Sequence, residues 1–218
     1  MKRFLFSVCA LAAVVVGCSK SEVLNRPNAD MPIEFNPYTG RVPVTKAIAA
    51  TITDLGVDGF QVYAFLRGAN EQPKYDGTPF MNKEVKLKDG AWSYPGRAYW
   101  PANGVLDFIA YGLNAAPTPV EGQYNKITHT VDTLVANQKD LLVALGQRSL
   151  TYESTNGTVN LLFSHLLSRV GFSLITKADN NVNVRVEKVD LVGNFYGQGE
   201  VDLAMFEGDT LVLGGKDS

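Results

Sequence analysis

Residues 105–111 read Val-Leu-Asp-Phe-Ile-Ala-Tyr, an apolar stretch that only Asp107 interrupts. A short run of this kind, rich in aliphatic and aromatic side chains, is typical of a buried β-strand. A second stretch alternates, because successive side chains of a strand point to opposite faces. The shared face of that stretch carries Phe60, Val62, Ala64 and Leu66. These patterns predict two strands of a β-sheet.

Further strands are predicted on both sides of this pair. Side chains alternate at residues 127–131 and 159–163, and a buried-looking apolar run covers 141–145. Residues 85–94 fit a hairpin that turns at Lys88-Asp89-Gly90. Only 140–148 and 163–170 also have a pattern that fits a short helix. Many short strands at fairly regular spacing indicate an all-β sandwich.

The N-terminus has the pattern of an export signal. Lys2 and Arg3 precede an apolar stretch, residues 4–16, that is too short to span a bilayer as a helix. Gly17 and Cys18 follow the stretch directly, and this junction resembles the lipobox of bacterial lipoproteins, in which the thiol is acylated and becomes the new N-terminus. Cys9 leaves with the signal, so Cys18 is the single cysteine of the mature chain. We expect removal of residues 1–17 and attachment to a membrane through lipid on Cys18.

Composition argues against several functions. The formal net charge is −2, whereas nucleic-acid binding usually needs a basic face. The two histidines, His129 and His165, cannot form a zinc site with a single lipidated cysteine. The chain also has no Gly-x-Ser-x-Gly nucleophile elbow. We therefore predict no enzyme activity, no catalytic residues, no cofactor, no metal and no nucleic-acid partner.

The segment between Cys18 and the first long strand contains a short strand of its own. Residues 19–32 are polar and are expected to form a tether, after which Ile33 and Phe35 share one face of a strand at residues 31–36. Residues 36–41, Asn-Pro-Tyr-Thr-Gly-Arg, have the composition of a turn. Arg41 is then expected in an exposed loop, a preferred place for proteolytic cleavage.

An aromatic group offers a different kind of site. It consists of Trp92, Tyr94, Tyr99 and Trp100. Aromatic side chains on strands more often belong to a core or to cross-strand pairs than to a ligand surface. The alternative is a surface lipoprotein that stays monomeric and binds a glycan or a host ligand through these rings. Exposed tryptophans would favour this alternative, and buried tryptophans would favour the core.

Several segments in a fixed order carry a family resemblance. They are the lipobox at Cys18, Ile33-Glu34-Phe35 followed by residues 41–47, residues 60–65, Trp92-Ser93-Tyr94 with Tyr99-Trp100-Pro101, residues 106–111, residues 139–144 and residues 161–170. Together they resemble the fimbrillin family, the pilin and pilus-tip lipoproteins of anaerobic gut and oral bacteria. The resemblance covers residues 18–175 and becomes vague toward the C-terminus.

The resemblance implies two transthyretin-like β-sandwich modules and export as an outer-membrane lipoprotein of a surface fimbria. In stalk pilins of this family a trypsin-like protease removes an N-terminal strand, and a strand from a neighbouring pilin subunit takes its place. Carried onto this chain, the released strand contains Ile33 and Phe35, and the cut follows Arg41 or, as a second candidate, Lys46. The alternative for Arg41 is a solvated loop residue of an anchor or tip protein that is never cut.

These expectations divide the chain into four parts. Residues 1–17 are the signal peptide, 18–41 the lipidated tether and pro-strand, 42–166 the N-terminal sandwich, and 167–218 a C-terminal β module that is apparently incomplete. The function expected is that of a structural or accessory pilus subunit. The position in the pilus, stalk, anchor or tip, stays open.

Replacing Cys18 with Ser is expected to abolish acylation, because the modified thiol is absent. After expression in a bacterial host, the variant should leave the detergent phase in a Triton X-114 partition and should carry no lipid by mass spectrometry. Cys9→Ser is the matched control and should partition as the unmodified protein does. A Cys18→Ser protein that still carries lipid would contradict the prediction.

Overall fold

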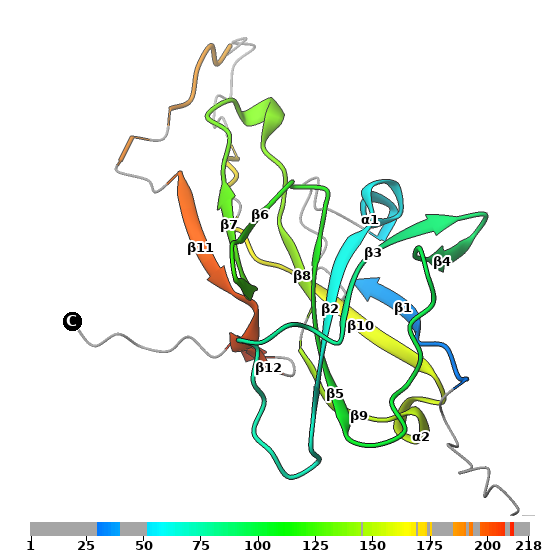
Figure 1. Cartoon of the computed structure of the whole chain (residues 1–218). Coiled ribbons are helices and arrows are strands. Elements are labelled where there is room, and N and C mark those ends of the chain that lie inside the picture. Colours follow the sequence, from blue (N-terminus) through cyan, green and yellow to red (C-terminus); the bar gives the residue numbers. More distant parts are fainter. Residues whose placement is uncertain are drawn as a thin grey trace, which may run out of the picture.

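The computed structural model describes residues 30–39, 52–144, 146–168, 170–173, 175, 185–190, 192–193, 197–207 and 210–211. Residues 1–17, Cys18, Arg41 and Lys46, which carry the predicted signal, lipid and cleavage sites, lie outside the described residues. The described part is almost entirely β-structure with short helices (Figure 1). None of the described helices is both long and apolar enough to cross a membrane.

The elements follow one another along the chain as short strands with brief helical turns. The first half contains β1 (Glu34–Thr39), α1 (Ile52–Asp58), β2 (Phe60–Arg67), β3 (Met81–Lys88), β4 (Ala91–Ser93), β5 (Val105–Gly112) and β6 (Thr118–Val120). The second half contains β7 (Gln123–Thr130), η1 (Val135–Asn137), β8 (Leu142–Ala144), β9 (Gln147–Leu150), α2 (Tyr152–Thr155), β10 (Thr158–His165), β11 (Gln198–Asp202), η2 (Leu203–Met205), β12 (Phe206–Glu207) and β13 (Thr210–Leu211).

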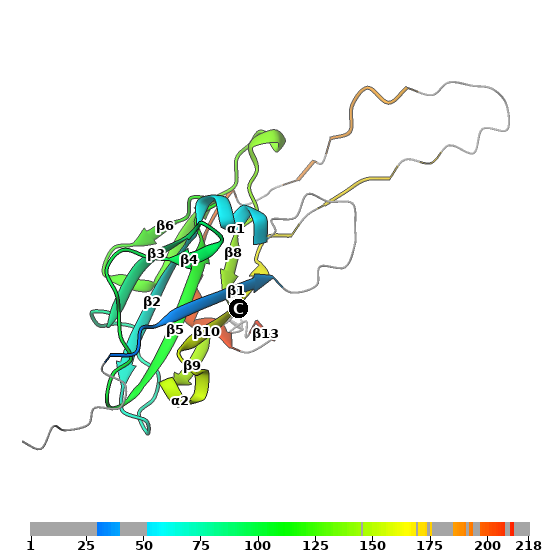
Figure 2. The same ribbon diagram turned by 90° about the vertical axis from the view of Figure 1, so that its right-hand side faces the viewer.

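The main sheet has eight strands and curls until its two ends meet. Its order is β1-β10-β8-β5-β2-β3-β4, with β9 paired to β5 beside this path. Strand β1 lies at one end of this order and β4 at the other. The segment that follows β4 contacts the residues just before β1. The amide of Ile33 donates to the carbonyl of Ala98 at 2.9 Å, and Pro32 forms an antiparallel bridge with Tyr99. Figure 2 shows β1 lying across the molecule beside β10.

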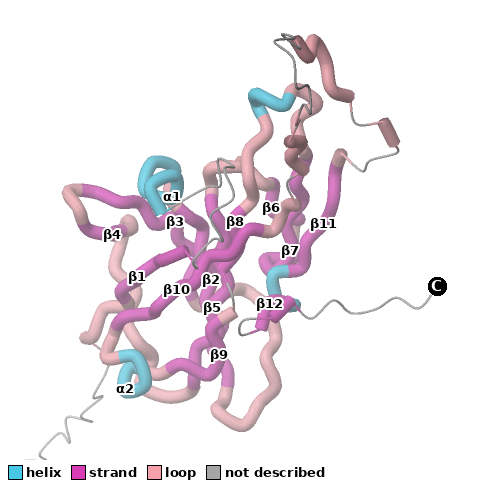
Figure 3. The backbone as a smooth tube through the Cα atoms, turned by 180° about the vertical axis from the view of Figure 1, so that it is seen from behind, coloured by secondary structure: helices cyan, strands magenta, loops and turns pink. Residues whose placement is uncertain are grey.

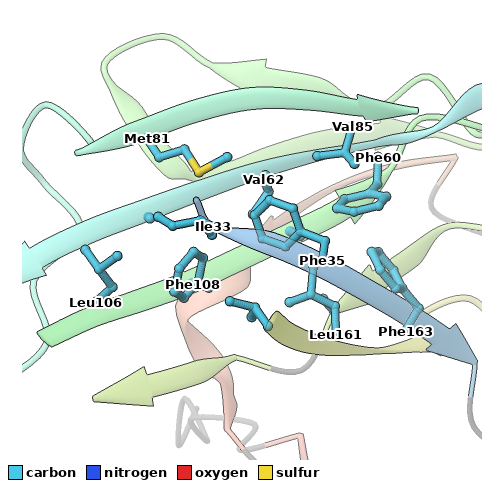
Figure 4. Close-up of a cluster of buried hydrophobic side chains, with 14 of the residues drawn as sticks. Ile33, Phe35, Phe60, Val62, Met81, Val85, Leu106, Phe108, Leu161 and Phe163 are labelled. Atoms are coloured by element: carbon cyan, nitrogen blue, oxygen red, sulfur yellow. The ribbon is translucent and has the colours of Figure 1, made fainter. Parts of the chain in front are cut away.

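Two apolar clusters lie on the two faces of this sheet. The inner cluster fills the curl and includes Phe60, Phe108 and Phe163 together with Ile33 and Phe35 (Figure 4). The outer cluster lies on the opposite face of β2, β5 and β8, and is covered by residues of β7 and η2. A second sheet, β11-β7-β6, contributes to this cover. Both faces of β5 are therefore buried, which explains why residues 105–111 are apolar without alternation.

The exception in that stretch, Asp107, is paired. Its side chain is fully buried, and the Arg67 guanidinium donates to both carboxylate oxygens, at 2.6 and 3.0 Å. The backbone amide of Ser149 donates a third hydrogen bond at 2.7 Å. The network joins β2, β5 and β9, because Arg67, Asp107 and Ser149 come from these strands. A buried carboxylate needs such partners, since burial of an unpaired charge is costly.

The structure confirms most of the predicted strands and corrects some details. The strand predicted at residues 31–36 is confirmed in part, since β1 begins at Glu34 and runs through Thr39. The turn predicted for residues 36–41 is therefore wrong at residues 36–39, and residues 40 and 41 lie outside the described residues. The helix pattern at 140–148 and 163–170 does not form one in the described residues, where β8, β9 and the end of β10 lie instead. The hairpin at Lys88-Asp89-Gly90 is confirmed, with Leu87 opposite Trp92.

The C-terminal segment contacts the N-terminal sheets. Strand β11 pairs antiparallel with β7, from Gln198 opposite Thr130 to Asp202 opposite Lys126. Leu203 of η2 is fully buried in the outer cluster. Between β10 and β11, the described residues form no helix or strand, and Val170, Phe172 and Ile175 are more than half exposed. Figure 3 shows β11 beside β7 from behind.

Arg67→Leu is expected to lower the free energy of unfolding by about 3–5 kcal/mol, because it leaves the Asp107 carboxylate buried without its counter-ion. Urea unfolding measures the change. Lys74→Ala is the matched control, since the Lys74–Asp76 pair is exposed and surface pairs contribute little. Equal stability of the two variants would show that the Arg67–Asp107 pair does not hold the sheet together.

Candidate functional site: strand β1 and the surface that holds it

Strand β1 presents an apolar face to the protein and a polar face to solvent. Ile33, just before the strand, is 1% exposed and Phe35 is 7% exposed, and Pro37 is also buried. Glu34, Asn36 and Tyr38 point the other way and are exposed. The alternation of the sequence causes this arrangement, because strand side chains alternate between faces. The strand therefore supplies part of the inner cluster from the edge of the sheet.

The backbone of β1 is paired on one side only along most of its length. It runs parallel to β10, from Glu34 opposite Thr158 to Thr39 opposite Phe163. The amide of Glu34 donates to Gly157 of the β10 side at 3.0 Å, whereas the neighbouring amide of Ile33 points away and donates to Ala98. Since amide direction alternates along a strand, the position of Pro37 faces away from β10 as well.

Proline at this position protects the edge. The ring removes a backbone donor, and an edge strand tolerates this loss when the N–H would have faced solvent. Pro37 also makes the outer side of β1 a poor template for another strand. The same reasoning explains why Asn36-Pro37, predicted as part of a turn, instead belongs to the strand.

Phe35 is the centre of the contact between β1 and the inner cluster. Its ring packs edge-on against the rings of Phe60, Tyr94 and Phe108, with centroid distances of 6.0, 5.8 and 6.1 Å. Edge-to-face pairs add to the free energy gained by burying the area. Figure 4 shows Ile33 and Phe35 pointing from β1 into this cluster. We call the residues that contact β1 the β1 contact surface: Phe60, Tyr94, Ala98, Phe108 and strand β10.

Two aromatic residues of the loop after β4 fix the start of the strand. The Tyr94 hydroxyl donates to the carbonyl of Ile33 at 2.6 Å. Burial raises the pKa of Tyr94 above its ordinary value, so the phenol keeps its proton for this bond. The Trp100 indole donates to the carbonyl of Gly157 at 3.2 Å, and the same carbonyl accepts from the amide of Glu34.

A side-chain hydrogen bond fixes the exposed face of the pairing. The Asn36 amide group donates to the Asn160 side-chain oxygen at 2.8 Å. The two residues are partners in the parallel register. A shift of β1 by one residue would break this bond and would turn Phe35 toward solvent.

The four residues of the candidate ligand surface occupy different environments. Trp100 is 1% exposed, and Trp92 and Tyr94 pack partly buried against the inner cluster. Trp92 lies against Phe60 with ring centroids 5.4 Å apart. Tyr99 is 39% exposed. Trp100 therefore has no free face on which a sugar could stack, and the packing of Trp92 favours the core interpretation.

The two histidines lie on different strands, His129 on β7 and His165 at the end of β10. The Nδ1 atom of His165 forms a short hydrogen bond with the Asp140 carboxylate. His129 is 8% exposed and its buried Nε2 atom has no hydrogen-bond partner within the described part of the chain. Burial lowers the pKa of His129, and the Asp140 charge opposes this effect. Among the described residues, no three His, Cys, Asp or Glu side chains are grouped to hold a metal ion.

Sequence reasoning missed part of this site. The shared face of Ile33 and Phe35 is predictable, because it follows from the alternation of neighbouring residues. The roles of Tyr94, Gly157 and Asn160 depend on contacts between distant segments, and no local pattern signals them. Cys18, Arg41 and Lys46 lie outside the described residues, so their roles remain predictions.

The chain belongs to the fimbrillin-like family, whose family model matches residues 45–210. A solved fimbrial protein from Bacteroides vulgatus is similar in structure, with 23% sequence identity and a TM-score of 0.49. The match covers 62% of this chain and 45% of that protein, so this chain spans less than half of its length. A comparison with curated proteins gave no match.

Phe35→Ala is expected to lower the free energy of unfolding by about 3–5 kcal/mol, because it empties the centre of the β1 contact surface. Tyr38→Ala is the matched control on the solvent face of the same strand and should change stability by no more than about 0.5 kcal/mol. Urea unfolding of both variants measures the difference. Equal effects would contradict the position of β1.

Proposed function

We infer that this protein is a structural or accessory subunit of a surface pilus. Its membership of the fimbrillin-like family supports this role, and that family is one of structural pilins rather than enzymes. We further infer that the protein is exported to the outer membrane as a lipoprotein through Cys18. In assembly, β1 would be released by a trypsin-like protease after Arg41 or Lys46, and a strand from another pilin subunit would replace it.

The observation that supports strand exchange is the position of β1. It is an edge strand with a buried apolar face, and its covalent connection to β2 passes through residues 40–51, which contain both candidate cleavage sites. Departure of β1 would expose the apolar area now covered by Ile33 and Phe35. Each of these side chains contributes about 1.5–3 kcal/mol when fully buried. A strand from a neighbour would recover that free energy together with the backbone hydrogen bonds.

Cleavage would matter because of the covalent link. A tethered strand is present at an effective concentration of the order of millimolar, so a strand from solution competes poorly with it. Once the chain is cut within residues 40–51, β1 is no longer tethered, and a strand that dissociates is diluted into solution. A strand from a second subunit held nearby would then be present at a higher effective concentration than the released β1. In this proposal residues 42–166 form the accepting module and residues 167–218 the shorter C-terminal module.

Trypsin treatment of a Cys18→Ser protein that lacks residues 1–17 tests the proposal. We expect cleavage after Arg41 or Lys46, identified by N-terminal sequencing, followed by multimers on a native gel. Arg41→Gln with Lys46→Gln should prevent both events, because trypsin requires the basic residue.

Arg97→Gln is the matched control, since Arg97 is an exposed arginine in a loop of the described structure. This variant should be cut and should assemble as the parent does. A parent protein that resists trypsin at both sites and stays monomeric would contradict the pilin role and would favour a monomeric binding lipoprotein. Cleavage without multimers would contradict exchange between copies of this chain.

A further inference from the structure

We propose that His129 is a pH-sensitive switch for the C-terminal strand β11. The end of β11 that lies opposite His129 stays paired with β7 while the imidazole is neutral, and it separates from β7 when the imidazole takes up a proton. Acidification therefore opens the second sheet at this end. The proposal does not rest on the pilus role, because it concerns a contact within one molecule.

The imidazole of His129 lies in an apolar environment. His129 is 8% exposed and lines a cavity of about 190 Å³. The large side chains that share this cavity are aliphatic: Val131, Leu141, Leu166, Leu167 and Val201. The Nε2 atom is buried and has no hydrogen-bond partner among the described residues. An imidazolium donates from both ring nitrogens, and a buried charge without an acceptor is costly, so this position favours the neutral ring.

The strand opposite His129 is weakly held at this end. Gly199 of β11 is the partner of His129 in the antiparallel register, and the Val131 amide donates to the carbonyl of Gly197 at 2.7 Å. Neither glycine has a side chain that could pack against β7. Figure 3 shows β11 beside β7, and β11 is the edge of its sheet. The other end of β11 continues into η2, where Leu203 is fully buried. Local opening is therefore expected to begin beside His129.

Protonation and opening are linked through the solvation of His129. Burial lowers the pKa of His129 in the closed sheet, whereas an opened end exposes the ring to water and restores the ordinary value of about 6.5. The open form therefore binds the proton more tightly than the closed form. The free energy that neutral His129 contributes to closure is complete above about pH 6.5 and is lost as the pH falls below that value.

Asp140 is the charged group that acts on His129. Its negative charge favours the imidazolium and so opposes the effect of burial on the pKa of His129. One of its carboxylate oxygens is hydrogen-bonded to Nδ1 of His165, and the other is buried with no partner in the described part of the chain. Asp140 therefore raises the pH at which the switch responds.

The other charges near this end of the sheet are engaged elsewhere. Lys126 and Glu200 form an ion pair at 3.1 Å and lie on the opposite face from His129, because side chains alternate along β7 and β11. Asp132 is exposed, and its carboxylate accepts the amide of Leu134 within its own loop. The response to acid is therefore assigned to His129 with Asp140.

The composition of the chain makes the switch testable. His129 and His165 are its two histidines, and histidine is the side chain whose ordinary pKa lies between about pH 5 and pH 8. Two single substitutions therefore separate the contributions of these two side chains to a response in this range.

The test follows amide hydrogen exchange by NMR in the mature chain that carries Cys18→Ser, from about pH 8 to about pH 5. We expect the protection factor of the Val131 amide to fall below about pH 6.5, while amides between β2 and β5 keep their protection. The fall should level off once His129 is protonated, which its own imidazole resonance reports.

Three variants separate a switch from a structural role. His129→Gln cannot take up a proton in this range, so its Val131 protection should not depend on pH. His165→Gln is the matched control and should respond as the parent protein does. Asp140→Asn removes the negative charge, so the titration of His129 should move to lower pH. A purely structural role of Asp140 would instead lower the protection at every pH and leave the titration where it is.

Two results would overturn the proposal. One is a Val131 protection factor that stays constant in the parent protein while the His129 resonance titrates, and this measurement needs no variant to fold. The other is an equal fall of protection in His129→Gln. The outcome is independent of the trypsin experiment, since a protein that never assembles can still open β11 in acid.

Discussion

The parallel pairing of β1 with β10 is the constraint on which the rest of the structure depends. It places Ile33 and Phe35 over the inner cluster and completes a sheet whose two ends otherwise remain apart. A domain of this kind is stable by only about 5–15 kcal/mol. The burial of two large apolar side chains is a substantial share of that amount. The integrity of the inner cluster is therefore tied to one strand at the edge of the sheet.

Strand β1 is bound firmly to its own sheet, while its free edge is a poor partner for strands of other molecules. Its inner side is bound by aromatic packing, by the Tyr94 hydroxyl and by β10, whereas Pro37 withdraws a donor from its outer side. An edge strand without such protection invites association with other sheets. The two properties come from different sides of the strand: the inner side provides tight binding, and the outer side resists further pairing.

The sequence predicted local features of the site better than distant ones. The alternation around Ile33 and Phe35 identified their buried face, and the apolar run at residues 105–111 identified a buried strand. The partner of β1 was not predictable, because Asn36 and Asn160 are 124 positions apart and parallel pairing leaves no hairpin signal. The composition of residues 36–41 favours a turn, but Pro37 lies in a strand, because its missing N–H would point away from β10. The apolar run at residues 105–111 did not explain Asp107. The structure shows that its buried carboxylate is paired with Arg67 from the neighbouring strand β2.

The large separation between β1 and β10 has a consequence for how the chain folds. Strands β2, β3 and β5 pair with near neighbours in the sequence, whereas β1 must wait until β10 is in place. Contacts between distant residues form slowly, because closing the long loop costs conformational entropy before any stabilising contact forms. A nearly folded protein with an empty place beside β10 is then expected on the way to the native state. The order of folding therefore leaves the place beside β10 open until the N-terminal strand docks there.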